Sequence, residues 1–176
     1  MAGVYKASLL GIILSIVCLS SPKPAVGSDG QSDKGDSSIR IDIPVKLEKA
    51  DVVFNMNHLV LRGDMPLGMR YMDLMAKGFK ESGTKCRIIG VFYNDGGHLT
   101  LNDKAYNSSR NVSTGNPYKG IIADLLAQGV EIEECAETMR AHKWTHDDLL
   151  PGVKVNQGAV WRIVQLSQQG FVQVQP

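Results

Sequence analysis

Cys135 is the residue whose type and position most clearly offer chemistry. It follows a β-rich run at residues 130–134 and precedes a short segment of helical character that extends to about His142. A helix N-terminus exposes free backbone N–H groups and a partial positive charge, which favour the nucleophilic thiolate. Arg140 and His142 add positive potential to this neighbourhood. Three nearby carboxylates oppose it: Glu133, Glu134 and Glu137. The alternative is a small cysteine that fills space in the core.

Further polar side chains follow other predicted strands of the chain. Asn57 and His58 come after the first strand, Asn94 after the second and Asn156 after the fourth. In open α/β sheets, ligands bind beyond the carboxyl ends of the strands. The sequence therefore predicts one site at this edge, with Cys135 as the reactive group. The pocket residues predicted around it are Asn57, His58, Asn94, Arg140 and Asn156.

Sulfur ligands near a histidine offer a second chemistry. Met56, His58 and Cys135 suggest a Cu(I) site, because thioether and thiolate ligands select that ion. Four methionines at helical spacing are instead interpreted as a stripe of the core: Met65, Met69, Met72 and Met75. The sequence contains no CxxC or HExxH spacing, so no metal site of those types and no cofactor are expected.

Cys86 is predicted at the start of the second strand, at the opposite edge from Cys135. The length of the strands separates the two thiols too widely for a disulfide. We therefore expect both cysteines to be free, and Cys86 to be a buried structural residue.

The elements that position these residues alternate between strand and helix. β-rich runs predict strands at residues 52–54, 87–93, 130–134, 153–155 and 171–174. Helical spacing predicts helices at residues 66–81, 116–129, 136–142 and 159–169, and a polar stretch predicts a long loop at residues 94–113. This alternation implies an α/β fold with parallel crossovers and a doubly wound sheet.

Apolar spacing also predicts which helix faces point inward. The expected inward residues of the first helix are Leu67, Tyr71, Leu74, Met75 and Phe79. Those of the last helix are Val160, Ile163, Val164 and Leu166.

The N-terminal segment has the features of a signal peptide. Lys6 precedes an apolar run at residues 7–19, and small residues precede a cleavage site after Gly27. The run is short for a membrane span, although an uncleaved anchor is the alternative. Residues 1–27 are therefore a predicted signal peptide, 28–49 a flexible linker or arm, and 50–176 the folded domain. The mature chain would be periplasmic and free of the membrane.

The charge of the chain argues against one class of partner. The whole sequence has a net charge of +1, and removing the signal peptide with its two lysines leaves −1. Binding to nucleic acid requires a basic surface that neutralises phosphates, so no nucleic-acid partner is expected.

The segment GVEIEECAETMRAHKWTHDDLLPGVKVNQGAVWRIVQLSQQGFVQVQP resembles the C-terminal half of DsrE/DsrF-like proteins, of the YchN/TusD type. The resemblance covers roughly residues 50–176. It implies a flavodoxin-like α/β fold of three layers, with a mostly parallel sheet of about five strands. It also implies assembly as a homo-oligomer, a trimer or hexamer.

Some members of this family carry sulfur as a persulfide on a cysteine, and Cys135 matches that cysteine. The resemblance therefore implies a sulfur carrier similar to a sulfurtransferase. The predicted signal peptide, in contrast to the cytoplasmic members of the family, places this carrier in the periplasm. Its partner would be a sulfur donor or acceptor protein or a small sulfur compound. Two alternatives remain open: a non-enzymatic binding module for Cu(I), and an oligomeric interaction protein in which Cys135 is only packed.

Overall fold

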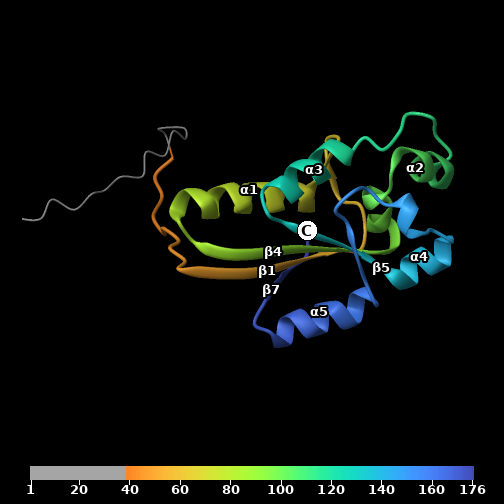
Figure 1. Ribbon diagram of the computed structural model, residues 1–176. Helices are drawn as coiled ribbons and strands as arrows, with labels where there is room; N and C mark the ends of the chain where they lie inside the picture. The colour runs from red at the N-terminus through yellow and green to blue at the C-terminus, as the bar shows by residue number, and fades with distance from the viewer. Residues whose placement is uncertain (1–38) are drawn as a thin grey trace, which may run out of the picture. The chain divides into compact units, whose positions relative to one another are not determined.

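The computed structural model describes residues 39–176 (Figure 1). The predicted signal peptide and the first part of the predicted linker lie outside the described residues. The chain divides into two units at residue 43. In the described part of the first unit, Arg40 pairs with Asp42 at 2.6 Å. The second unit, residues 44–176, is the α/β domain.

A five-stranded parallel sheet forms the centre of this domain, in the order β6-β5-β4-β1-β7. The strands are β1 (Lys49–Met56), β4 (Lys85–Phe92), β5 (Glu131–Cys135), β6 (Lys154–Asn156) and β7 (Val172–Val174). Numbered along the chain, these five strands lie in the order 4-3-2-1-5, whereas flavodoxin itself has 2-1-3-4-5. The predicted α/β fold with a mostly parallel sheet of five strands is confirmed.

Helices cover both faces of the sheet and make three layers (Figure 1). One face carries α1 (Leu67–Ser82) and α3 (Lys119–Ala127), and the other carries α5 (Ala159–Gln168). At the carboxyl ends of the strands lie η1 (Asn94–Thr100), α2 (Asp103–Arg110) and α4 (Ala136–His142). Two smaller elements complete the domain: the β2–β3 pair (Leu61–Arg62 and Met65–Pro66) and η2 (His146–Asp148).

The central strands are apolar at nearly every position because each face has its own core. In β1, Val52 and Phe54 pack toward α1 and α3, whereas Val53 packs toward α5. In β4, Ile88 and Ile89 divide in the same way between the two cores. This burial on both faces is what parallel strands with helical crossovers require.

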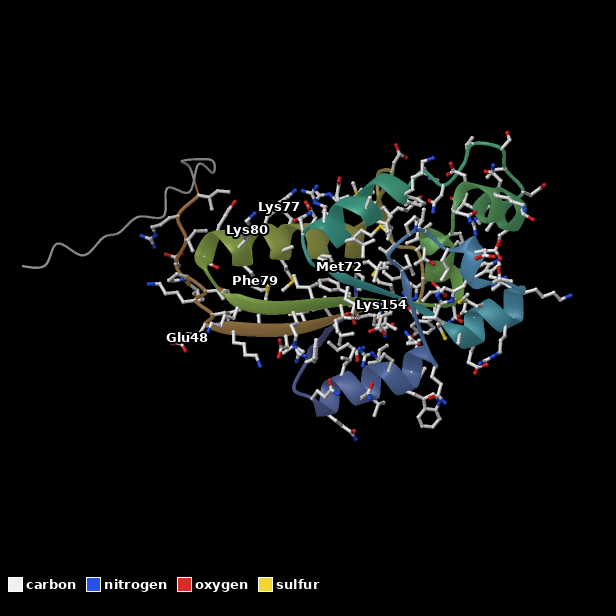
Figure 2. The ribbon with its side chains drawn as sticks, in the orientation of Figure 1. Glu48, Met72, Lys77, Phe79, Lys80 and Lys154 are labelled. Atoms are coloured by element: carbon white, nitrogen blue, oxygen red, sulfur yellow. The ribbon has the colours of Figure 1, made fainter. Side chains whose placement is uncertain are left out.

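The predicted methionine stripe belongs to the core in α1, whereas its first member, Met65, lies in β3 and is 38% exposed. Met69 and Met72 are fully buried, and Met72 lies between the helix and the sheet (Figure 2). The predicted inward positions of Tyr71 and Leu74 are wrong, since they are 41% and 51% exposed. The buried face is centred on Met69, Met72 and Ala76, so the long residues beside it reach solvent.

The last helix shows the same kind of error. Ile163 and Leu166 of α5 are buried as expected, whereas Val160 and Val164 are 63% and 49% exposed. Only one face of α5 meets the sheet, and the valines on its outer side remain unpartnered in the described chain.

The predicted long loop at residues 94–113 is wrong, because the segment folds into η1 and α2. The Oδ1 atom of Asn102 accepts a hydrogen bond from the N–H of Ala105 at 2.9 Å and caps α2. Ala105 is the buried residue of this helix, so α2 has too little apolar surface to produce a visible helical period.

The other predicted boundaries agree more closely with the structure. The glycines after α1, α3 and α5 have positive φ angles of 69°, 84° and 89° at Gly83, Gly129 and Gly170. These left-handed conformations end the helices and favour glycine. Within residues 39–176, no helix combines the length and apolar character needed to cross a membrane.

Candidate functional site

Cys135 is the last residue of β5 and the residue that precedes α4, as the sequence predicts. Its side chain does not cap α4. Instead, the Sγ atom accepts a hydrogen bond at 3.2 Å from the backbone N–H of Ala159, the first residue of α5. Cys135 is 4% exposed and packs with Tyr93 in the core between the sheet and α5. The helix N-terminus that faces the sulfur is therefore that of α5.

Glu133 points to the same face of the sheet as Cys135, two residues before it. Arg162, in the first turn of α5, binds this carboxylate with Nε at 3.0 Å and Nη2 at 2.7 Å from Oε1. The Glu133 side chain is 4% exposed and that of Arg162 is 24% exposed. Asn156, which pairs with Cys135 across β5 and β6, donates to Glu133 Oε2 at 3.1 Å. The charge of Glu133 is therefore compensated beside the thiol.

Glu134 points to the opposite face of the sheet and is fully buried. Burial raises its pKa to about 8, although contacts with the Thr100 hydroxyl and the Cys135 backbone N–H oppose the shift. Thr100 Oγ1 lies 2.9 Å from both Glu134 Oε2 and the carbonyl oxygen of Gly97. A hydroxyl has one proton, so a protonated Glu134 that donates to Thr100 allows Thr100 to donate to Gly97. Glu134 is accordingly neutral at pH 7.

Glu137 and Arg140 form an ion pair with each other on α4, with both side chains exposed. Arg140 is therefore engaged at the surface. The three carboxylates expected to oppose a thiolate at Cys135 are now accounted for: Glu133 is paired with Arg162, Glu134 is neutral at pH 7, and Glu137 is paired with Arg140.

The remaining predicted pocket residues do not all converge on the sulfur. Asn94 is exposed, and its backbone N–H donates to the Thr138 hydroxyl of α4 at 3.1 Å. Asn57 accepts a hydrogen bond from Gln175 at 3.1 Å. Of the predicted set, the structure brings Asn156 next to Cys135 through the β5–β6 pairing.

His58 opens onto a separate polar cavity of about 190 Å³ at the same edge of the sheet. His98 and Arg110 also line it, together with Tyr106 and Tyr118. Burial lowers the pKa of His98. The rings of His98 and Trp144 meet edge-on, with 5.0 Å between their centroids. Sequence analysis did not group His98, Tyr106 and Arg110 in a cavity because they lie in the segment predicted to be a loop. Tyr118 lies just before α3, in the segment predicted to be a helix.

The structure also separates the three residues of the copper alternative. Met56 is 2% exposed in the core beneath α1, and Cys135 lies in the core beneath α5. His58 is exposed. Among the described residues, no group of three or more His, Cys, Asp or Glu side chains is arranged to hold a metal ion.

Cys86 and Cys135 are both free, as predicted. The expected burial of Cys86 is wrong, because this cysteine is exposed at the amino end of β4. The β4–β5 ladder begins at the pair Ile89–Glu131, so β5 does not cover the first residues of β4.

Sequence analysis also missed Arg162 and Ala159 as neighbours of the thiol. The alternation of side chains along a strand gives one usable signal, since it places Glu133 and Cys135 on one face. A buried carboxylate needs a partner, but nothing local indicates that the partner comes from α5.

A family model and one solved structure agree with this architecture. The model of the DsrE/DsrF-like family matches residues 69–174. The structure of a protein of unknown function from Methanobacterium thermoautotrophicum is similar, with 25% identity and a TM-score of 0.56, over 72% of this chain and 99% of that chain. The ychN protein from E. coli has 15% identity and a TM-score of 0.49 over the same shares. No curated protein matches the chain.

Proposed function

The chain belongs to the DsrE/DsrF-like family, in which sulfur relay is the general activity, and on this premise we propose that Cys135 carries a sulfane sulfur atom. The sulfur would be held as a persulfide and passed to an acceptor thiol. The proposal also includes export to the periplasm and assembly as a homo-oligomer. The exposed apolar side chains of α5 and β7 support assembly, with Trp161 78% and Val172 65% exposed.

The observation that carries the proposal is the hydrogen bond from the Ala159 N–H to the Cys135 sulfur. A backbone N–H at a helix N-terminus, with the partial positive charge of that terminus, stabilises anionic sulfur. The compensated or neutral state of Glu133, Glu134 and Glu137 removes the main source of repulsion. A thiolate is the form that attacks a sulfane sulfur.

The transfer balances without an added oxidant or reductant. The Cys135 thiolate attacks the outer sulfur of a donor persulfide, R–S–S⁻, and the donor leaves as the thiolate R–S⁻. The product is Cys135–S–S⁻. An acceptor thiolate then attacks the outer sulfur, takes it as its own persulfide and returns Cys135 as a thiolate. Two sulfur–sulfur bonds form and two break over the cycle.

The burial of Cys135 adds a step before this chemistry. Cys135 is 4% exposed, and Gly158 and Ala159 precede and begin the helix that covers its sulfur. We infer that this first turn of α5 moves aside when the donor enters. Loading of Cys135 is therefore expected to be slower than modification of the exposed Cys86.

Intact-protein mass spectrometry tests the proposal on protein expressed as the full chain and recovered from the periplasm of a bacterial host. After incubation with polysulfide, we expect the mass of one added sulfur atom, removable by a thiol reductant. The Cys86→Ser variant, in which Cys135 is the thiol that remains in the predicted mature chain, should gain this mass, and the Cys86→Ser/Cys135→Ser double variant should lack it. An adduct that survives in Cys135→Ser and disappears in Cys86→Ser would overturn the proposal. The same spectra test export, because a mature chain that begins at Ser28 is expected.

A further inference from the structure

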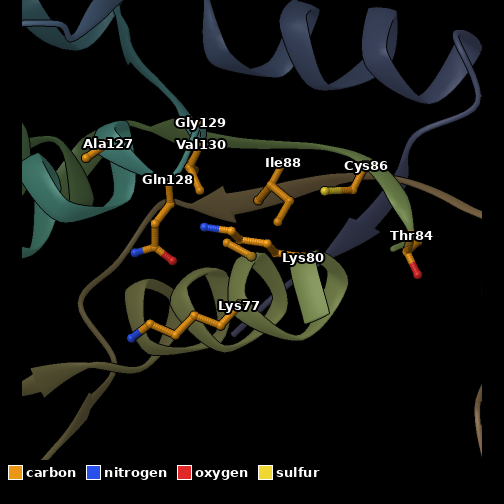
Figure 3. Close-up of a pocket in the computed structure, with 10 residues that line it drawn as sticks. Lys77, Lys80, Thr84, Cys86, Ile88, Ala127, Gln128, Gly129 and Val130 are labelled. Carbon is orange, nitrogen blue, oxygen red and sulfur yellow. The ribbon is translucent and has the colours of Figure 1, made fainter. Parts of the chain in front are cut away.

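A second cavity lies at the amino end of the sheet, away from the carboxyl edge that holds Cys135. It has a volume of about 560 Å³ and is lined by α1, β4 and the turn between α3 and β5 (Figure 3). Its origin is the late start of β5: the ladder with β4 begins at Ile89, so no strand of the described chain lies beside Lys85–Ile88 on that side. We call this cavity the amino-end cleft.

The walls of the amino-end cleft are largely apolar. Four aliphatic side chains line it, from α1, β4, the end of α3 and the turn before β5: Ala76, Ile88, Ala127 and Val130. A volume of this size with mostly apolar walls is typical of small-molecule sites. The apolar part of a ligand would gain free energy by leaving water here.

The charges that line the cleft all have one sign. Lys77 and Lys80 line it, and no carboxylate does. Lys77 is bound to Asp73 at 2.7 Å. Lys80 has no ion-pair partner within residues 39–176, and its side chain lies along the cleft (Figure 3). The Cys86 thiol lines the same space and is exposed.

We propose that the amino-end cleft binds a small organic anion with an apolar tail, such as a carboxylate or sulfonate. The tail lies on Ile88 and Val130, and the anionic head pairs with the Lys80 ammonium. A neutral molecule of the same shape lacks the ion pair, and a cation is repelled by Lys80, the cleft lysine that has no carboxylate partner within residues 39–176. This site is independent of the sulfur chemistry at Cys135 and has its own occupant.

The exposed thiol of Cys86 provides the measurement. Octanoate is the probe, and the rate of alkylation of Cys86 by iodoacetamide is followed by peptide mass spectrometry in a Cys135→Ser background. We expect octanoate to slow alkylation of Cys86. Three controls isolate the two parts of the ligand: acetate lacks the tail, 1-octanol lacks the charge, and octyltrimethylammonium reverses it. We expect none of the three to protect at the octanoate concentration that halves the rate.

Two variants locate the site, and one serves as a matched control. Lys80→Gln should weaken protection by octanoate about fivefold, the size expected for an exposed ion pair. Lys85→Gln removes a neighbouring exposed lysine that does not line the cleft, and it should leave protection unchanged. Ala127→Trp places a large side chain in the cleft at an exposed position, so the domain should fold normally while octanoate no longer protects.

Specific outcomes would overturn the proposal. Equal protection by octanoate and 1-octanol would show that the cleft does not select an anion. Absence of protection by octanoate would show that the cleft does not bind this class of ligand. If Cys86 is unreactive in protein without octanoate and becomes reactive when the protein is diluted, a second copy of the chain covers the cleft. That result would contradict the proposal that a small organic anion binds there. Because Cys135 is absent from this background, none of these outcomes depends on sulfur transfer.

Discussion

Cys135 and Cys86 lie on neighbouring strands, β5 and β4, at opposite ends of one parallel sheet. At the carboxyl end, Cys135 packs beneath α5, is 4% exposed and accepts a backbone hydrogen bond from Ala159. At the amino end, the late start of β5 leaves Cys86 exposed beside an open cleft. The chemistry available to a thiol therefore depends on which end of the sheet holds it: an oriented, enclosed sulfur at one end and an accessible one at the other.

The ion pairs of the two ends differ in the same way. Glu133 and Arg162 form a largely buried pair near Cys135, with side chains 4% and 24% exposed. Asp51, at the amino end, is bound by Lys49 and Arg87, whose side chains are 70% and 58% exposed. Partners that remain in water contribute little to stability, whereas the loss of one member of a buried pair leaves an uncompensated charge.

The largest expected effect is at the buried pair. Arg162→Ala leaves the Glu133 carboxylate buried without its guanidinium, and it should lower the free energy of unfolding by about 3–5 kcal/mol. Urea denaturation at pH 7 measures the change. The exposed Arg140–Glu137 pair is the control, since Arg140→Ala should cost about 0.5 kcal/mol or less. A double variant with Glu133→Gln should recover part of the loss. Equal effects of the two arginine variants would contradict the distinction between the two kinds of pair.

The next effect concerns pH and Glu134, the other buried carboxyl of the closed end. Burial raises its pKa from an ordinary value of 4.5 to about 8. Between these values the folded state holds a proton that the unfolded state releases, so stability should fall as pH rises through this window. The glutamine of Glu134→Gln does not titrate. The free energy of unfolding of this variant, relative to that of the wild type, should therefore rise by an amount on the order of 2 kcal/mol from pH 5 to pH 8. Urea titrations at several pH values measure this, with the exposed Glu137→Gln as control. Parallel curves for wild type and Glu134→Gln would show that Glu134 is ionised throughout.

The smallest change in stability is expected at Asp51, at the amino end of the sheet. Hydrogen bonds from Arg87, and then from Lys49, lower the pKa of Asp51 to about 2. The lowered pKa contributes stability above pH 3.8, and that contribution is lost as pH falls through about 2. Asp51→Asn should therefore cost about 1 kcal/mol or less at pH 7, and the difference should shrink at pH 2. A loss at pH 7 as large as that of Arg162→Ala would show that the exposure of Lys49 and Arg87 does not limit what they contribute at Asp51.

Much of the fold could be predicted from the sequence, because its signals are local. The runs around Val53 and Ile89, and the glycines such as Gly129 that end helices, indicate strands and boundaries from nearest neighbours alone. The α2 segment could not be predicted, since its helix is stabilised by an Asn102 cap and one buried alanine. The wrong face of α1 has a related cause: large residues such as Tyr71 remain half-exposed beside a methionine core.

The candidate site could be predicted less completely. Cys135 could be identified because a strand end and a helix start meet at one residue. Asn156 could be placed beside it because adjacent parallel strands end at one edge. His58 could not be grouped correctly, since η1 builds a separate cavity with His98 around it. Arg140 could not be grouped correctly either, because it forms an ion pair with Glu137 on its own helix and does not face the thiol.

The sequence by itself determined the alternation of strands and helices, the apolar cores and the position of Cys135 at the end of β5. Only the tertiary structure decided what the thiol and the carboxylates contact. Ala159 is 24 residues from Cys135 and Arg162 is 29 residues from Glu133, so both contacts depend on how α5 crosses the sheet. The exposure of Cys86 likewise depends on the register between β4 and β5. Periodicity and capping act over a few residues, whereas burial and charge compensation arise from segments that meet only after the chain has folded.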